Sequence, residues 1–96
     1  MRIVWSPLAR QDLAEIEDYI GYDNPIAAEV MAAKIRQAVE RLITFPASGR
    51  PGRSPHTREL VIAGTPYIMP YIVAEDEIRI IAVIHTARKW PDDSNA

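Results

Sequence analysis

The chain has 96 residues, no cysteine and a formal net charge of −2 at pH 7, and 48% of its residues are hydrophobic. This length accommodates one domain but not two, and the composition is that of a globular protein. The lack of cysteine excludes disulfides, thiolate catalysis and thiolate metal sites. His56 and His85 are the only histidines, so we expect no metal centre and no cofactor.

The N-terminus shows no pattern that would direct the chain to or through a membrane. Met1 to Trp5 leads at once into Ser6 and Pro7, and no apolar run approaches the length of a membrane span. We therefore expect a cytoplasmic protein. The negative net charge argues against binding nucleic acid through bulk electrostatics, although basic residues outnumber acidic ones over 34–58 and could form one positive surface.

Residues 2–5 predict a short first strand that ends where a helix begins. Ser6 followed by Pro7 is the pattern of an N-cap with proline at the first helical position. Apolar residues then recur at steps of three and four, which predicts an amphipathic helix of about four turns that is broken by residues 21–25. These apolar positions are Ala9, Leu13, Ile16 and Ile20.

Asn24 and Pro25 repeat the cap-and-proline pattern and predict a second helix that begins immediately. Its apolar positions step by three and four over about five turns as far as Phe45, and Pro46 marks its end. Two consecutive amphipathic helices with a short connection predict an antiparallel helix hairpin.

Residues 47–55 predict a basic loop without regular structure, because glycine and proline are interspersed there with Arg50 and Arg53. After this loop the pattern becomes strand-like. A meander of three strands is predicted, at 57–62, 66–74 and 78–85. Pro70 lies inside the middle strand and cannot donate a ladder hydrogen bond, so we expect a bulge or a bend there.

The last predicted strand is apolar on both faces, as a central strand would be. Alternation puts Ile78, Ile80, Ala82 and Ile84 on one face, and Arg79, Ile81, Val83 and His85 on the other. The order of elements predicts an α+β domain: a short N-terminal strand and an antiparallel helix hairpin packed on one face of a small antiparallel sheet. The face with Arg79 and His85 would then be only partly covered.

Short motifs are spread over nearly the whole chain. They are Val4 to Ala9, Asp12 and Leu13, Ile16, Asn24 and Pro25, Ala27 and Ala28, Leu42, Pro46, Gly49 to Gly52, Arg58 to Leu60, Pro66 to Ile68, Tyr71, and His85 to Pro91. In order and spacing they resemble the ParE branch of the RelE/ParE superfamily of bacterial toxins. The resemblance implies one toxin domain over residues 1–91 and a short tail at 92–96.

The resemblance also implies a function, that of the toxin in a type II toxin–antitoxin module. Such a toxin is a small cytoplasmic protein that a cognate antitoxin wraps and neutralises. For ParE-like members the implied target is DNA gyrase, which they stall on cleaved DNA. RelE-like members instead cleave mRNA on the ribosome, so the chemistry of the individual residues has to distinguish the two.

Cleavage of RNA by its own 2′-hydroxyl requires a base, cations for the developing charge and an acid. Here His85, Arg79 and Arg88 are the candidates for these roles. RelE-like nucleases carry further basic residues on the middle strands, where this chain has Leu60 and Ile68, and its tail after Arg88 has no Tyr or His. We therefore expect no catalytic residues and no enzymatic activity. The alternatives are a ribosome-dependent endoribonuclease and an inactive or purely antitoxin-binding relic.

Without catalysis, the same residues are candidates for binding an antitoxin or a target. Arginine and tryptophan are enriched at binding hot spots, and both follow the last strand. The expected binding residues are Arg58, Tyr67, Tyr71, Arg79, His85, Arg88, Lys89 and Trp90. A lone histidine at a strand end is more often a hydrogen-bonded structural residue, and the tryptophan could pack back on the sheet. We expect no membrane contact and no direct sequence-specific binding of nucleic acid.

Overall fold

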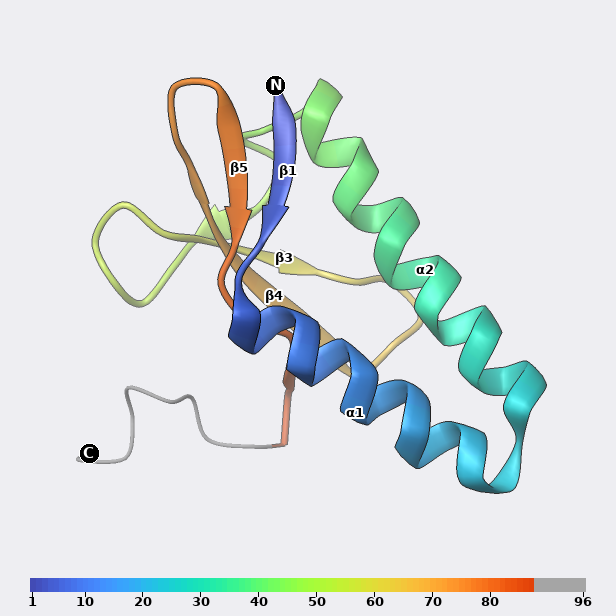
Figure 1. The fold of residues 1–96 in the computed structure, drawn as a ribbon. Coiled ribbons are helices and arrows are strands. Elements are labelled where there is room, and N and C mark those ends of the chain that lie inside the picture. The colour runs from blue at the N-terminus through green and yellow to red at the C-terminus, as the bar shows by residue number, and fades with distance from the viewer. Residues whose placement is uncertain (88–96) are drawn as a thin grey trace.

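The computed structural model describes residues 1–87, and Figure 1 shows the arrangement of their elements. In chain order these are β1 (Arg2–Trp5), α1 (Pro7–Asp23), α2 (Pro25–Thr44), β2 (Arg50–Pro51), β3 (Arg58–Val61), β4 (Tyr67–Val73), β5 (Glu77–Ile80) and β6 (Ile84–His85). The helices form a hairpin that packs against one sheet, which confirms the predicted α+β class.

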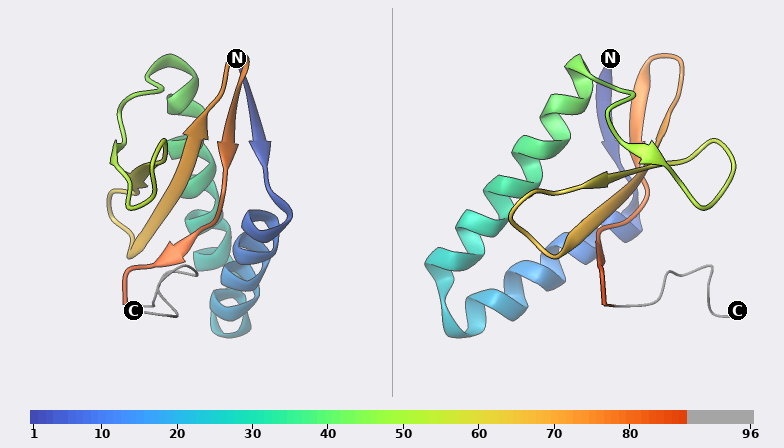
Figure 2. Two further views of the ribbon diagram at one scale, coloured as in Figure 1. Left: turned by 90° about the vertical axis from the view of Figure 1, so that its left-hand side faces the viewer. Right: turned by 180° about the vertical axis from the view of Figure 1, so that it is seen from behind.

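The strands form one mixed sheet in the order β1-β5-β4-β3-β2, and β6 pairs with β4 beyond the end of β5. β1 runs parallel to β5, while the other pairs are antiparallel as the meander predicts. β2 comprises only Arg50–Pro51 and pairs with β3. The prediction that the basic loop lacks regular structure is therefore wrong at these two residues, because the loop returns along the edge of β3. The rest of that loop projects from the sheet (Figure 2).

Both helices begin where their cap patterns predict. Ser6 Oγ accepts a hydrogen bond from the N–H of Ala9 at 3.0 Å, and Asn24 Oδ1 accepts one from the N–H of Ala27 at 3.0 Å. The predicted helix break over residues 21–25 is wrong in extent, because α1 continues to Asp23 and α2 starts at Pro25. Asn24 alone leaves the helical conformation. Its N–H donates to the Ile20 carbonyl and its side chain caps the next helix, so one residue serves both helices.

The core lies between the helix hairpin and one face of the sheet. Its fully buried side chains include Ile35 and Leu42 from α2, and Met69, Ile78 and Ile80 from the central strands. Tyr67, Met69 and Tyr71 alternate along β4 and all belong to this core, so they define the helix-facing side of the sheet. Ile68, Pro70 and Ile72 belong to the opposite face.

The predicted strand over residues 78–85 is interrupted, because β5 ends at Ile80 and β6 begins at Ile84. Tyr71 pairs with Ile80, and Tyr67 pairs with His85. The segment from Ile80 to His85 therefore has one residue more than the segment of β4 from Tyr67 to Tyr71 that it faces. An inserted residue moves every following side chain to the other face of the sheet. The predicted alternation is therefore wrong beyond Ile80.

The insertion changes which side chains share a face. His85 lies opposite Tyr67 and hence on the helix-facing side, whereas Arg79 lies opposite Ile72 on the other side. Val83 is buried and packs in the core cluster. The expectation that Arg79 and His85 share one partly covered face is thus wrong.

Pro70 accounts for the place of the interruption. It stays in register with Glu59 of β3, so β4 has no bulge on that side. Its carbonyl accepts a hydrogen bond from the N–H of Ile81 at 2.9 Å. The N–H and C=O of a strand residue point toward the same neighbouring strand. An N–H at position 70 would therefore face residues 81–83, and proline has none. The predicted irregularity exists, but it lies in the neighbouring strand and not at Pro70 itself.

The corner between β1 and α1 is fastened to the end of β5. The Ser6 N–H donates to the Ile80 carbonyl at 3.0 Å, and the Ser6 hydroxyl donates to the Ile81 carbonyl at 2.7 Å. Ser6 therefore caps a helix and also bonds the sheet, whereas the hydrogen bonds of Asn24 within residues 1–87 all lie inside the helix hairpin.

Removal of the Ser6 hydroxyl should cost more stability than removal of the Asn24 side chain. Substitution of either by Ala removes an N-cap worth about 1 kcal/mol. Ser6→Ala also takes away the donor of the Ile81 carbonyl, which adds about 1 kcal/mol. Urea unfolding followed by circular dichroism measures both changes. Ser6→Thr keeps the hydroxyl and should recover most of the loss, and equal losses in the two Ala variants would contradict the dual role of Ser6.

Candidate functional site

The structure separates the binding residues predicted from the sequence into three groups. Tyr67 and His85 line a pocket beside α1, Tyr71 and Arg58 support the loop between α2 and β2, and Arg79 lies on the opposite face of the sheet. Within residues 1–87 they do not form one continuous site.

Three further residues predicted to bind, Arg88, Lys89 and Trp90, lie outside the described residues, as does the tail at 92–96. Their roles stay predictions. Among residues 1–87, no group of three His, Asp or Glu side chains could hold a metal ion.

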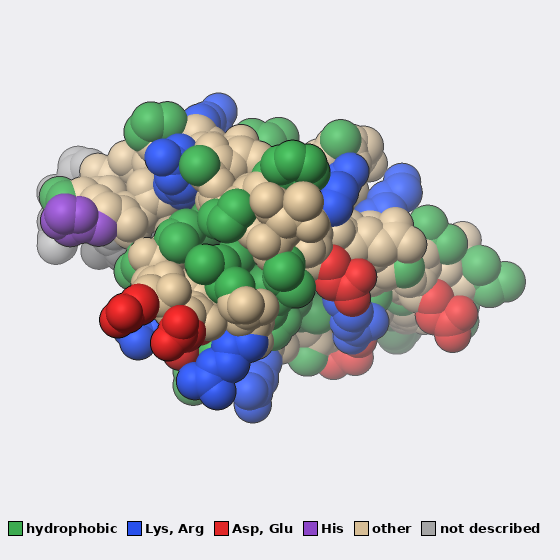
Figure 3. Space-filling model, turned by 90° about the horizontal axis from the view of Figure 1, so that it is seen from above, with side chains coloured by type: hydrophobic (Ala, Val, Ile, Leu, Met, Phe, Trp, Pro, Cys, Tyr) green, Lys and Arg blue, Asp and Glu red, His purple; other side chains and the backbone are tan. Residues whose placement is uncertain are grey.

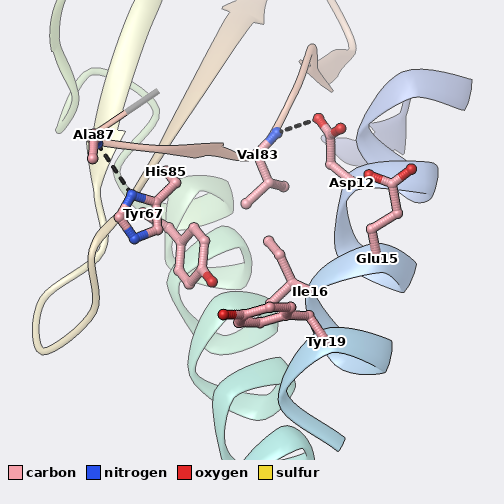
Figure 4. Close-up of a pocket in the computed structure, with 8 residues that line it drawn as sticks. All are labelled: Asp12, Glu15, Ile16, Tyr19, Tyr67, Val83, His85 and Ala87. Carbon is pink, nitrogen blue, oxygen red and sulfur yellow. Dashed lines mark hydrogen bonds between the residues drawn. The ribbon is translucent and has the colours of Figure 1, made fainter. Parts of the chain in front are cut away.

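The pocket lies between α1 and the end of the sheet where β4 and β6 pair (Figure 4). It is open to solvent and has a volume of about 470 Å³. Its lining residues are Asp12, Glu15, Ile16 and Tyr19 from α1, and Tyr67, Val83, His85 and Ala87 from the sheet side. The helical residues are spaced by three, one and three, so they share one face of α1. The pocket thus has an acidic and aromatic wall facing a strand.

His85 is held by contacts within the chain. Its Nδ1 accepts a hydrogen bond from the N–H of Ala87 at 3.1 Å. A ring nitrogen that accepts from an N–H bears no proton, so the proton of the neutral ring lies on Nε2. The ring also makes an edge contact with Tyr67, with the centroids 5.5 Å apart and the planes at 88°. These contacts orient the imidazole beside the pocket.

Asp12 joins α1 to the interrupted strand. Its Oδ2 accepts a hydrogen bond from the N–H of Val83 at 2.9 Å, which satisfies a backbone donor that has left the regular ladder (Figure 4). The sequence interpretation missed this residue. Asp12 lies three positions after Ala9 and four before Ile16, so helical spacing places it beside the apolar face of α1 and marks an acid directed toward the sheet.

Tyr71 and Arg58 hold the loop that follows α2. The Tyr71 hydroxyl donates to the Pro46 carbonyl at 2.7 Å and accepts from the Gly49 N–H at 2.9 Å, while Arg58 Nη1 donates to the Gly49 carbonyl at 2.8 Å. A Cβ atom on Gly49 would lie 2.6 Å from the Tyr71 hydroxyl, so this close approach requires glycine. Tyr71 is fully buried and supports the loop. Its predicted role in binding a partner stays a prediction.

Glu59 organises the basic loop from within. Its side chain is 5% exposed, and its Oε1 accepts from Arg50 Nη2 at 3.1 Å and Arg50 Nε at 3.2 Å. Its Oε2 accepts from the backbone N–H of Arg53 at 3.2 Å. A buried carboxylate is tolerated when it is paired and hydrogen-bonded in this way. The loop is therefore fixed to β3 and is not merely solvated.

Arg79 takes part in a surface ion-pair network on the far side of the sheet from His85. Arg79 Nε lies 2.6 Å from Glu77 Oε2, and Arg2 Nη2 lies 3.1 Å from Glu77 Oε1. The hydrogen bond from Arg79, followed by the one from Arg2, holds the pKa of the Glu77 carboxyl below its usual value of 4.5. The charges of Arg79 and Arg2 are thereby engaged at the β1–β5 edge.

Replacement of Glu77 should have a pH-dependent effect on stability. A carboxyl whose pKa is lowered by folding stabilises the fold above its unfolded-state pKa, and this contribution is lost as the pH falls through the folded-state pKa. Glu77→Gln should lower the free energy of unfolding relative to the wild type at pH 7, and the difference should disappear below about pH 3. Thermal unfolding across this range tests it. Added salt should also shrink the difference, and a pH-independent loss would contradict the ion-pair origin.

Exposed apolar side chains also gather at the end of the molecule that contains the N-terminus. Seen from above, hydrophobic side chains lie between basic and acidic ones (Figure 3). Exposed large hydrophobic residues of the described chain include Met1, Phe45 and Val73. Apolar side chains are thus exposed on this face of the molecule.

Comparisons with known proteins agree on one family. The family model described as "ParE toxin of type II toxin-antitoxin system, parDE" matches residues 3–90. The chain is 48% identical over 90 residues to "Putative toxin Y4kP" of Sinorhizobium fredii, covering 94% of this chain and 93% of that protein. It is 38% identical over 87 residues to "Toxin RelE2" of Caulobacter vibrioides, covering 91% and 97%.

A solved structure has the same fold. It is described as "Chromosomal ParDE TA system from P. aeruginosa", and it superposes with a TM-score of 0.80 at 27% sequence identity. The match covers 88% of this chain and 95% of the other.

Proposed function

This chain belongs to the ParE toxin family and is the toxin of a type II toxin–antitoxin module, and from that premise we propose that it inhibits DNA gyrase by binding, without catalysis. A cognate antitoxin would neutralise it, and both would act in the cytoplasm. Among residues 1–87, no helix has the length and apolar character needed to cross a membrane.

One observation carries the preference for binding over catalysis. The nuclease alternative would use His85 as a base and Arg79 as a cation for the same phosphate, but the two side chains lie on opposite faces of the sheet. Arg79 is also paired with Glu77, which offsets its charge. A base and a cation must converge on one reacting group to stabilise a phosphorane. Their separation supports a toxin that acts by contact.

The positions where nucleases carry additional cations agree with this proposal. Leu60 lies opposite Met69 and packs against the core, and Ile68 is buried between β3 and β6. Neither position could present a charge without cost, because burial of an unpaired charge is strongly unfavourable.

The name of the Caulobacter relative, RelE2, favours the endoribonuclease as a second candidate. In this chain such an activity would have to centre on His85, whose ring lies beside an open pocket. The two candidates differ in their cellular product, which is stalled gyrase in one and cut transcripts in the other.

Purified protein should inhibit the supercoiling of relaxed plasmid by DNA gyrase, and induced cells should stop growing while their transcripts stay intact. A supercoiling gel and sequencing of RNA 5′ ends measure these outcomes, and heat-denatured protein is the control. Uninhibited supercoiling at a large molar excess of toxin would contradict the gyrase target.

The same cells distinguish the alternatives. In-frame mRNA cuts that disappear in a His85→Ala strain would establish the nuclease instead of the gyrase inhibitor. Normal growth after induction without an antitoxin would indicate the relic, which binds an antitoxin but has no toxic activity.

A further inference from the structure

The edge of β6 that faces away from β4 is not paired with any strand among residues 1–87. β1 covers the same edge further up, along β5, but it ends at Trp5. Ser6 makes the last contacts, with the carbonyls of Ile80 and Ile81, and the chain then turns into α1. Beyond this corner the edge of the sheet faces α1 across the pocket, where a strand could be added (Figure 4).

The hydrogen-bond pattern shows which backbone groups this edge presents. The Thr86 N–H donates to the Pro66 carbonyl at 2.8 Å. Bonded and non-bonded pairs alternate along an antiparallel ladder, so His85 and Tyr67 form a non-bonded pair. The N–H and C=O of His85 therefore point away from β4 and toward α1. No group among residues 1–87 pairs with them.

One backbone group of the same edge, the N–H of Val83, already makes a hydrogen bond. This N–H points toward α1 and is bound by Asp12 at 2.9 Å. The chain thus satisfies the first backbone donor of this edge with a side chain, and the next donor and acceptor along the edge belong to His85. A backbone pair at this position matches what a strand of a second chain would require.

The opposite wall favours a cation. The Glu15 carboxylate lines the pocket from α1, as does the ring of Tyr19, which is 81% exposed. Tyr67 contributes a second ring from β4 (Figure 4). A planar guanidinium can bond carboxylates while it stacks on an aromatic face, and arginine is suited to this combination. A pocket of about 470 Å³ has room for such a side chain.

We propose that the groove between α1 and β6 binds an extended segment of a protein partner, which pairs its backbone with His85 and places an arginine side chain beside the Glu15 carboxylate and the Tyr19 ring. This inference rests on the proposed function only in that a toxin of this family acts and is controlled through protein partners. The Glu15 carboxylate, the exposed Tyr19 ring and the open strand edge all favour the same occupant, a strand that carries a basic side chain.

The proposal is tested by NMR on the ¹⁵N-labelled full-length chain. The probes are the peptide acetyl-TVTRVTV-amide, the same peptide with Glu in place of Arg, and N-acetylarginine amide. The arginine peptide should shift the amide signals of Val83 and His85, slow hydrogen exchange at the His85 amide, and bind more tightly than either other probe. This readout is independent of gyrase, so a failed supercoiling assay leaves it intact.

Two matched variants locate the charge. Glu15→Gln removes a carboxylate that lines the pocket and should weaken the arginine peptide about fivefold, as loss of a partly exposed ion pair would. Asp18→Asn makes the same change on an exposed residue of α1 outside the pocket and should leave the affinity unchanged. Dispersed spectra of both variants establish that they are folded.

Three outcomes would overturn the proposal. The His85 amide could fail to shift at millimolar arginine peptide, or the glutamate peptide could bind equally well. N-acetylarginine amide could give the same affinity as the peptide, which would indicate a small-cation pocket. Shifts at the same amides that depend on protein concentration without any peptide would instead identify a second copy of the chain as the occupant.

Discussion

The missing N–H of Pro70 is the constraint on which the rest of this end of the molecule depends. β4 pairs with β3 in a continuous register. On the side that faces residues 81–83, however, β4 has no N–H donor at Pro70. The neighbouring chain leaves the ladder over residues 81–83 and returns one residue out of step. That single residue moves His85 to the helix side, brings Val83 into the core, and leaves the two backbone groups of His85 directed at α1.

Two polar side chains stabilise the irregular segment that Pro70 causes. Ser6 binds the Ile81 carbonyl on one side of the interruption, and Asp12 binds the Val83 N–H on the other. Each also belongs to α1 or its cap, so the first helix is fastened to the sheet at the point where the sheet is least regular. Buried backbone groups that leave a ladder need such partners, since an unsatisfied one costs about 1–3 kcal/mol. The helix that forms one wall of the pocket is thereby fixed relative to the strand that forms the other.

The helices, the order of elements and the α+β class could be predicted from the sequence because each depends on local signals. Ser6 with Pro7 and Asn24 with Pro25 determine the helix starts without reference to the rest of the chain. The site could not be predicted in the same way. Alternation assumes that a strand is continuous, and the insertion before Ile84 has no local signature, because its cause is a proline in the neighbouring strand. The role of Tyr71 in holding the loop could not be predicted for a related reason: only the fold brings Gly49 close enough to donate to its hydroxyl.

The same insertion also explains why a catalytic arrangement of His85 and Arg79 conflicts with the fold. Bringing both to one face would require a continuous strand from Glu77 to His85, and that register would turn Val83 away from the helices. Val83 is 5% exposed and packs in the core, and burial of a valine side chain contributes about 1.5–3 kcal/mol. In the regular register, a carbonyl of the neighbouring strand would also face Pro70. Because proline has no N–H, that carbonyl would receive no hydrogen bond. The core and the proline therefore favour the register that separates the histidine from the arginine, and this register is the one that opens a strand edge to a protein partner.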